Sequence, residues 1–267
     1  CSGVLRYNPN IQHLDCEGLD YDVPNVMAGL SLHKLQSLRM VGIDAGTNKG
    51  CLWHESSYSD SLHTVIWDAC DYMAEDFSAL LRNCPQIRSL SYKDYVYGEP
   101  SLLVENALLV TRLVNLSAFH NNSLSDDAVL SLAMNLTVLR SLNIQYCSGL
   151  TDQSLLYIAN HSCSTLEVLY ADIKNPESKE TGQVLETFSR KCTKLKYLNV
   201  DCGDKVLCAG RGTSMLVRGC PALRTLVVNK QETICESSRD FIADRRPELQ
   251  LLVHDDNTVY DILAMPI

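Results

Sequence analysis

A short apolar phrase recurs along almost the whole chain. In each copy one apolar residue is followed by another three places later, and the ten copies start about 26 residues apart. The first apolar residues are Ile11, Leu35, Leu62, Ile87, Leu116, Leu139, Leu166, Leu195, Leu223 and Leu249. Their partners are Leu14, Leu38, Val65, Leu90, Phe119, Leu142, Leu169, Leu198, Leu226 and Leu252. A unit this short cannot bury its apolar residues alone, so neighbouring units must stack.

The clearest copy, residues 139–147, reads L-x-x-L-x-L-x-x-C. This phrase and its period are typical of leucine-rich repeats, in which a short strand, a turn and a returning helix form each unit. We therefore expect an α/β fold: a leucine-rich-repeat solenoid, or horseshoe, of about ten strand–helix repeats with a parallel concave sheet. We expect one domain over residues 1–267, with repeats over about 5–257 and a C-terminal cap over 258–267.

Between the phrases, apolar residues at spacings of three and four predict helices over residues 73–82, 125–134, 151–160 and 184–190. Thr151 is the expected N-cap of the third. Residues 41–60, 92–100, 172–180 and 202–212 lack this period, so we expect loops there.

Twelve cysteines occur in the chain. Cys84, Cys163, Cys192 and Cys220 each precede a phrase by three residues, so stacking should align them in one column. Buried free cysteines act as small apolar residues, which favours reduced thiols and an intracellular protein, in the cytoplasm or the nucleus. Disulfides between stacked columns are the alternative. Four N-x-S/T sequons favour an extracellular recognition module instead, and they lie at Asn115, Asn121, Asn135 and Asn160.

Four runs of the form Cys-x-x-(Leu/Ile)-x-x-Leu begin at these column cysteines, and Tyr146-Cys147-Ser-Gly-Leu150-Thr151-Asp152 accompanies them. Together these runs resemble the cysteine-containing leucine-rich repeats of F-box/leucine-rich-repeat proteins. The resemblance implies the substrate receptor of an SCF-type cullin–RING ubiquitin ligase. It also implies that the SCF adaptor and the cullin are bound through an F-box, which would have to lie N-terminal to residue 1. A scaffold or assembly factor with the same repeat and no link to a ligase is the alternative.

Charge and motifs argue against several other functions. A net charge of −9 disfavours nucleic-acid binding, and no apolar run is long enough to cross a membrane. Cys202 and Cys208 are too far apart for a zinc knuckle, and the glycine-rich segment 210–212 lacks the P-loop lysine. We therefore expect a non-enzymatic protein-binding chain without a metal or a cofactor.

The period also predicts a binding face. With each phrase numbered from its first apolar residue, positions 1, 4 and 6 point inward, and positions 3, 5, 7 and 8 face the concave surface. Acids on this face are Asp15, Glu17, Asp68, Asp94, Asp172, Asp201, Asp255 and Asp256, and bases are Arg39, Lys93 and Lys230. This excess predicts a partner with a basic surface. The alternative is an ordinary solvated face.

Three tyrosines fall on this face in consecutive units: Tyr146, Tyr170 and Tyr197. Exposed, they would be contact residues for a partner, with Asp172 and Asp201 beside them to hold an Arg or Lys. Alternatively, each ring packs on the neighbouring strand. The candidate partner-binding residues are Tyr146, Tyr170, Tyr197, Asp172, Asp201, Asp68, Asn143 and Asn199. Trp53, in the loop over 41–60, either contacts a partner or fills a gap left by a missing helix.

Overall fold

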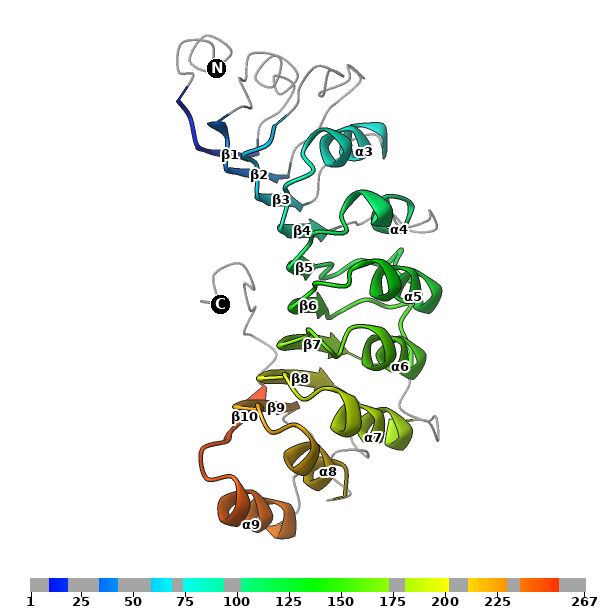
Figure 1. Cartoon of the computed structure of the whole chain (residues 1–267), viewed down its shortest axis with the longest axis vertical. Coiled ribbons are helices and arrows are strands. Elements are labelled where there is room, and N and C mark those ends of the chain that lie inside the picture. Colours follow the sequence, from blue (N-terminus) through cyan, green and yellow to red (C-terminus); the bar gives the residue numbers. More distant parts are fainter. Residues whose placement is uncertain are drawn as a thin grey trace.

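Ten parallel strands, joined in sequence order into one sheet, run through the computed structural model. The structure describes residues 10–18, 34–42, 59–68, 74–93, 102–172, 181–201, 211–229 and 236–254. Helices follow one side of the sheet, and the other side is the inner, concave face (Figure 1). The chain is a leucine-rich-repeat solenoid, as the repeat predicts.

Each unit contributes one strand. The strands are β1 (His13–Glu17), β2 (Ser37–Val41), β3 (Thr64–Asp68), β4 (Ser89–Lys93), β5 (Asn115–Ser117), β6 (Ser141–Ile144), β7 (Val168–Asp172), β8 (Tyr197–Asp201), β9 (Thr225–Asn229) and β10 (Gln250–His254). We number the units after these strands.

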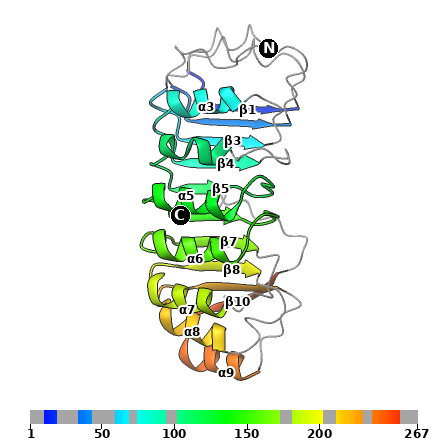
Figure 2. The ribbon, with the colours of Figure 1, turned by 90° about the vertical axis from the view of Figure 1, so that its right-hand side faces the viewer.

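The described helices stack in the same order on the outer side, which faces the viewer in Figure 2. They are α3 (Ala74–Asn83), α4 (Leu102–Glu105), the 3₁₀ helix η2 (Ala107–Leu109), α5 (Asp126–Asn135), α6 (Asp152–His161), α7 (Thr181–Lys191), α8 (Arg211–Gly219) and α9 (Glu236–Arg245). The four predicted helices correspond to α3, α5, α6 and α7. In the described part of the chain, every helix is too short or too polar to cross a bilayer.

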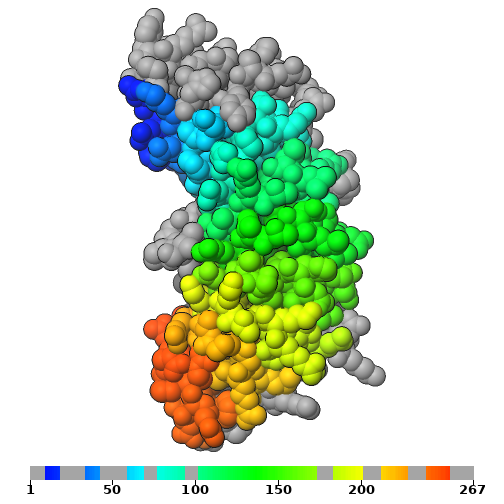
Figure 3. All heavy atoms as spheres, in the orientation of Figure 1, coloured from blue at the N-terminus to red at the C-terminus, as the bar shows by residue number. Residues whose placement is uncertain are grey.

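One residue of each strand lies in the same register and forms a continuous apolar ladder. Its members are Leu14, Leu38, Val65, Leu90, Leu116, Leu142, Leu169, Leu198, Leu226 and Leu251. Leu38 to Leu226 are buried, whereas the two end residues are partly exposed. The units therefore bury each other, as expected for a solenoid. Figure 3 shows the units stacked in sequence order.

Two phrases are displaced from the predicted alignment. In unit five, Leu116 pairs with Leu90 and Leu142, so the phrase starts at Leu113 and Leu116 is its second apolar residue. Phe119, predicted to point inward, is instead partly exposed at position 7. In unit ten, Leu251 pairs with Leu226. The predicted partner, Leu252, is 42% exposed, so that assignment is wrong by one residue.

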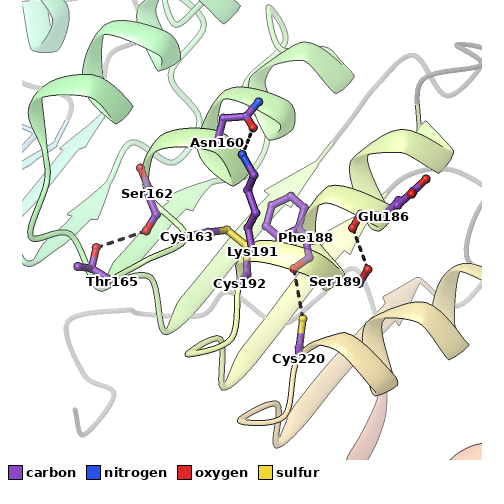
Figure 4. The surroundings of a disulfide bond; sticks show 10 residues. All are labelled: Asn160, Ser162, Cys163, Thr165, Glu186, Phe188, Ser189, Lys191, Cys192 and Cys220. Atoms are coloured by element: carbon purple, nitrogen blue, oxygen red, sulfur yellow. Dashed lines mark hydrogen bonds between the residues drawn. A yellow bond between two sulfur atoms is a disulfide. The ribbon is translucent and has the colours of Figure 1, made fainter.

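The cysteine column is buried, as predicted, but one pair in it is oxidised. Cys163, after α6, forms a disulfide with Cys192, after α7, across 4.5 Å between their Cα atoms (Figure 4). The expectation of reduced thiols is wrong for this pair, because stacking brings equivalent residues of adjacent units within disulfide reach. Cys84 and Cys220 are free, and burial raises the pKa of Cys84 to about 12 and that of Cys220 to about 11.

Helix starts link neighbouring units. The Thr151 hydroxyl accepts a hydrogen bond from the Gln153 N–H at 3.2 Å, which confirms the predicted N-cap. Asp126, in the first turn of α5, accepts from the Thr151 N–H at 2.9 Å, from the Thr151 hydroxyl at 2.6 Å and from Ser154. Asp126 therefore joins α5 to α6.

Several predicted features lie outside the described residues. They are most of the four loops, Trp53, the C-terminal cap, and Asp94, Lys230, Asp255 and Asp256 of the concave face. Helix α8 already begins at Arg211, so the fourth predicted loop, over 202–212, extends two residues too far.

Candidate functional site

The concave face carries more acid than base over its described part. Its described acidic side chains are Asp15, Glu17, Asp68 and Asp172, and its bases are Arg39 and Lys93, while the side chain of Asp201 lies outside the described part. The Arg39 guanidinium lies 2.8 Å from Asp15 and 2.7 Å from Glu17, and the Lys93 ammonium lies 3.9 Å from Asp68. Both bases therefore already face carboxylates, which leaves the face acidic overall. Burial raises the pKa of the Asp68 carboxyl, although Lys93, Arg39 and His120 oppose that shift.

Two of the three predicted tyrosines form a pair on this face. The rings of Tyr170 and Tyr197 lie 4.7 Å apart with an interplanar angle of 35°. Tyr170 is completely buried, which excludes the exposed alternative for this ring, whereas Tyr197 is half-buried. The geometry favours packing between neighbouring strands, the alternative reading of these rings.

The two predicted asparagines are also buried, with exposed fractions of 1% for Asn143 and 3% for Asn199. The Asn143 side-chain oxygen accepts a hydrogen bond from the Gln145 N–H at 3.0 Å, which orders the turn after β6. A partner could contact neither side chain without first uncovering it. Their predicted place on an exposed surface is therefore wrong.

Asp172 supports a turn. Its carboxylate accepts hydrogen bonds from the Tyr146 N–H at 2.9 Å and from the Gln145 side-chain amide at 3.2 Å. Tyr146 is half-buried, and its turn is held by a carboxylate of the next unit. Asp201 pairs with Asp172 in register at position 7 of β8. The structure thus brings Asp172 and Tyr146 together, with a positioning role for Asp172.

Tyr146 belongs to an aromatic cluster at the carboxyl end of β5 and β6. We call Phe119, His120 and Tyr146 the aromatic ledge. His120 and Tyr146 are stacked, with centroids 4.8 Å apart and an interplanar angle of 11°. Phe119 meets both edge-on, at 4.5 Å from His120 and 5.1 Å from Tyr146. The Lys93 ammonium lies 5.8 Å from the Phe119 centroid, and all three rings are half-buried.

The backbone under the ledge is left-handed. His120 and Tyr146 have φ angles of 56° and 58°, and Gly18 and Gly42, at the same position 8 of units one and two, both have 59°. The N–H groups of Gly18, Gly42 and His120 each donate to the position-7 carbonyl of the next unit at 3.0 Å. The turn therefore requires a residue with a positive φ, which glycine adopts without steric strain.

Sequence reasoning missed Phe119 and His120. With the phrase of unit five started at Leu116, Phe119 was assigned to the interior and His120 had no role. Starting it at Leu113 makes His120 equivalent to Tyr146. An even spacing was the available signal, because Leu113 lies 26 residues after Ile87 and 26 before Leu139. In the described residues, no group of three or more His, Cys, Asp or Glu side chains could hold a metal ion.

No family model and no curated protein sequence matches this chain. Among solved structures, a crystal structure of a TLR13–ssRNA13 complex matches with a TM-score of 0.53 and 15% identity, over 85% of this chain and 33% of that chain. This chain thus spans about a third of the TLR13 chain. A crystal structure of the Rad7 and Elc1 complex in yeast matches with a TM-score of 0.40 and 12% identity, over 97% of this chain and 84% of the other.

The Rad7 likeness is too weak to carry an argument, and the TLR13 likeness shows the fold alone. With the continuous parallel ladder, it establishes the architecture: this chain is a leucine-rich-repeat solenoid.

Proposed function

We propose that this chain is the substrate-binding part of a receptor of an SCF-type cullin–RING ubiquitin ligase, acting inside the cell. The observation that carries the proposal is the buried cysteine column: Cys84, Cys163, Cys192 and Cys220. The same arrangement is typical of the cysteine-containing repeats of F-box/leucine-rich-repeat proteins. In this proposal the adaptor and the cullin bind through an F-box outside this chain.

The chain itself would bind a protein substrate and perform no chemistry. The acidic concave face supports a substrate with a basic surface, because complementary charge accelerates encounter and selects orientation. Glu17, Asp68 and Asp201 share position 7 of their units, so they form one row along the sheet. Ubiquitin transfer would belong to the partner subunits.

One observation favours a second candidate, an extracellular recognition module. The Cys163–Cys192 disulfide suits an oxidising compartment. Of the sequon asparagines, however, Asn121 is fully buried and its side-chain oxygen accepts hydrogen bonds from the Ser123 N–H and hydroxyl. A glycan cannot occupy Asn121 in the folded chain. Free thiols at both cysteines in protein isolated from cells under thiol-blocking conditions would exclude the extracellular candidate.

The ligase proposal is tested by purifying the full-length gene product from cells and identifying its partners by mass spectrometry. We expect the SCF adaptor and a cullin together with at least one protein whose level rises on depletion of the receptor. A clean purification that lacks adaptor and cullin would remove the ligase role and favour a scaffold or assembly factor.

The binding face is tested separately by charge reversal. The double variant Glu17→Lys/Asp201→Lys should lose capture of the substrate while keeping the adaptor. The matched control is Asp240→Lys/Asp244→Lys, which reverses the same number of charges at two exposed positions on α9. Equal capture by the double variant and the control would place the binding surface away from the concave sheet.

A further inference from the structure

The left-handed turn at position 8 points away from the solenoid. A Cβ atom built on Gly18 or on Gly42 would meet no heavy atom within 4 Å. Packing therefore does not require a side chain at this position. Units five and six nevertheless carry His120 and Tyr146 there, at a conformational cost of about 1–2 kcal/mol for each non-glycine residue.

An interaction of the two rings must offset this conformational cost. Their stacking at 4.8 Å places two parallel π-systems at the carboxyl edge of the sheet, with Phe119 closing one side. Two further groups hold the assembly in place: Asp172 accepts from the Tyr146 N–H, and the Gln145 carbonyl accepts from the His120 N–H at 3.0 Å. This aromatic pair is partly exposed, its backbone is strained and hydrogen bonds hold it in place, and these properties are those of a contact site.

Charge indicates what the pair would bind. The Lys93 ammonium already lies over the Phe119 ring, so these rings accommodate a cation. The Asp68 carboxylate lies 3.9 Å from the Lys93 ammonium. A phosphate would meet this carboxylate and the −9 net charge of the chain. A stacked nucleobase would bring such phosphates with it, and nucleic-acid grooves are lined with positive charge.

We propose that the aromatic ledge binds an arginine side chain of the protein partner, with the guanidinium plane stacked on the Tyr146–His120 pair. Arginine fits better than lysine because its planar guanidinium stacks on aromatic faces and is more weakly hydrated. The inference deepens the proposed function, on which it rests, since it names the residue that the concave face would select.

The test uses Tyr146→Asn and His120→Asn, because asparagine tolerates left-handed backbone and leaves the turn intact. The probe is a fluorescein-labelled twelve-residue peptide of alternating serine and arginine, and binding is followed by fluorescence anisotropy at low salt. We expect each variant to bind the peptide on the order of tenfold more weakly than the unmodified chain. The serine–lysine peptide should bind the unmodified chain several-fold more weakly than the arginine peptide.

Two controls separate this inference from alternatives. Tyr157→Asn removes a half-buried tyrosine from α6, on the helical side, and should leave peptide affinity unchanged. Urea denaturation should show that Tyr146→Asn and His120→Asn unfold at about the same urea concentration as the unmodified chain, because relief of backbone strain offsets the lost ring contacts. A clear loss of stability in both would make the rings structural and overturn the proposal.

The remaining outcomes are equally decisive. Unchanged peptide affinity in both ledge variants would reject the ledge; if Glu17→Lys/Asp201→Lys still weakens binding, the proposed concave-face function survives that rejection. If neither the ledge variants nor Glu17→Lys/Asp201→Lys weakens peptide binding, the ledge proposal and the concave-face function are both rejected. Ring-dependent binding of a twelve-residue oligouridylate in preference to the arginine peptide would make the ledge a base-stacking platform and overturn the proposal.

Discussion

Leu142→Ala is the most direct test of the stacked core. Leu142 is 5% exposed and pairs with Leu116 on one side and Leu169 on the other, both fully buried. The void beside it, lined by apolar side chains such as Leu116 and Ile144, has room for roughly one water molecule. The alanine variant must therefore lose apolar contacts and open a cavity.

The expected loss follows from the three carbons removed. Their transfer free energy is about 2.4 kcal/mol at ~0.8 kcal/mol per carbon. The cavity raises the cost to about 3–5 kcal/mol. Because each unit contacts only its neighbours, the loss weakens both interfaces of unit six, and unfolding of the middle units should separate from that of the ends.

The matched control is Leu252→Ala, the same change at a position that the repeat pattern assigns to the core and the structure leaves 42% exposed. It should cost about 1 kcal/mol. The assay is urea denaturation followed by circular dichroism, with the free energy of unfolding compared at a common slope. Equal losses for the two variants, or a loss below about 1 kcal/mol for Leu142→Ala, would refute the ladder described above.

Four further outcomes can be measured on the same protein. Arg246→Met should lower the free energy of unfolding by about 2–3 kcal/mol, because the guanidinium donates to four carbonyl oxygens between residues 217 and 223; a loss under about 0.5 kcal/mol in urea would contradict this. Reduction of the Cys163–Cys192 disulfide, whose cysteines are 29 residues apart, should cost about 3–4 kcal/mol, and alkylation of both thiols in denatured protein without reductant would show that the bond is absent. Burial raises the pKa of the Cys84 thiol from 9.0 to about 12, so this thiol stabilises the fold below pH 9 and that stability is lost as pH rises toward 12; Cys84→Ala should flatten the alkaline fall in stability, and an unchanged pH slope would contradict this reasoning. Asp126→Ala should cost about 1–2 kcal/mol and speed amide exchange at the start of α6, and unchanged exchange there would show that the link between α5 and α6 is unimportant.

Much of the fold is predictable because burial of apolar residues dominates it. The spacing of three between Leu139 and Leu142 predicts a strand and the side of it that faces inward, and the predicted cap at Thr151 marks the start of α6. Unit five shows the limit of this reasoning. Leu113 and Leu116 each have an apolar residue three places later, so local spacing cannot choose between them. Only the pairing with the neighbouring strands decides which of the two residues starts the phrase.

The binding face is less predictable for a related reason. Alternation along a strand determines the face toward which Tyr170 points, while its exposed fraction depends on neighbours such as the Tyr197 ring. Likewise, equal repeat positions align Cys163 with Cys192, but only the stacked geometry brings their Cα atoms to 4.5 Å. The left-handed backbone at position 8 is the hardest feature to predict, because residues as different as Gly18 and Tyr146 adopt the same backbone angle there.

That shared backbone angle lets position 8 carry either glycine or an aromatic side chain, and we call this position a socket. In units one and two a Cβ atom at this position would meet no neighbouring atom, so exchange of glycine for an aromatic residue would change the surface of one unit at the cost of backbone strain. Successive sockets are separated by one strand spacing, about 4.8 Å. The choice of the unit that carries an aromatic residue at position 8 therefore sets where along the solenoid the contact site lies, in steps of one unit.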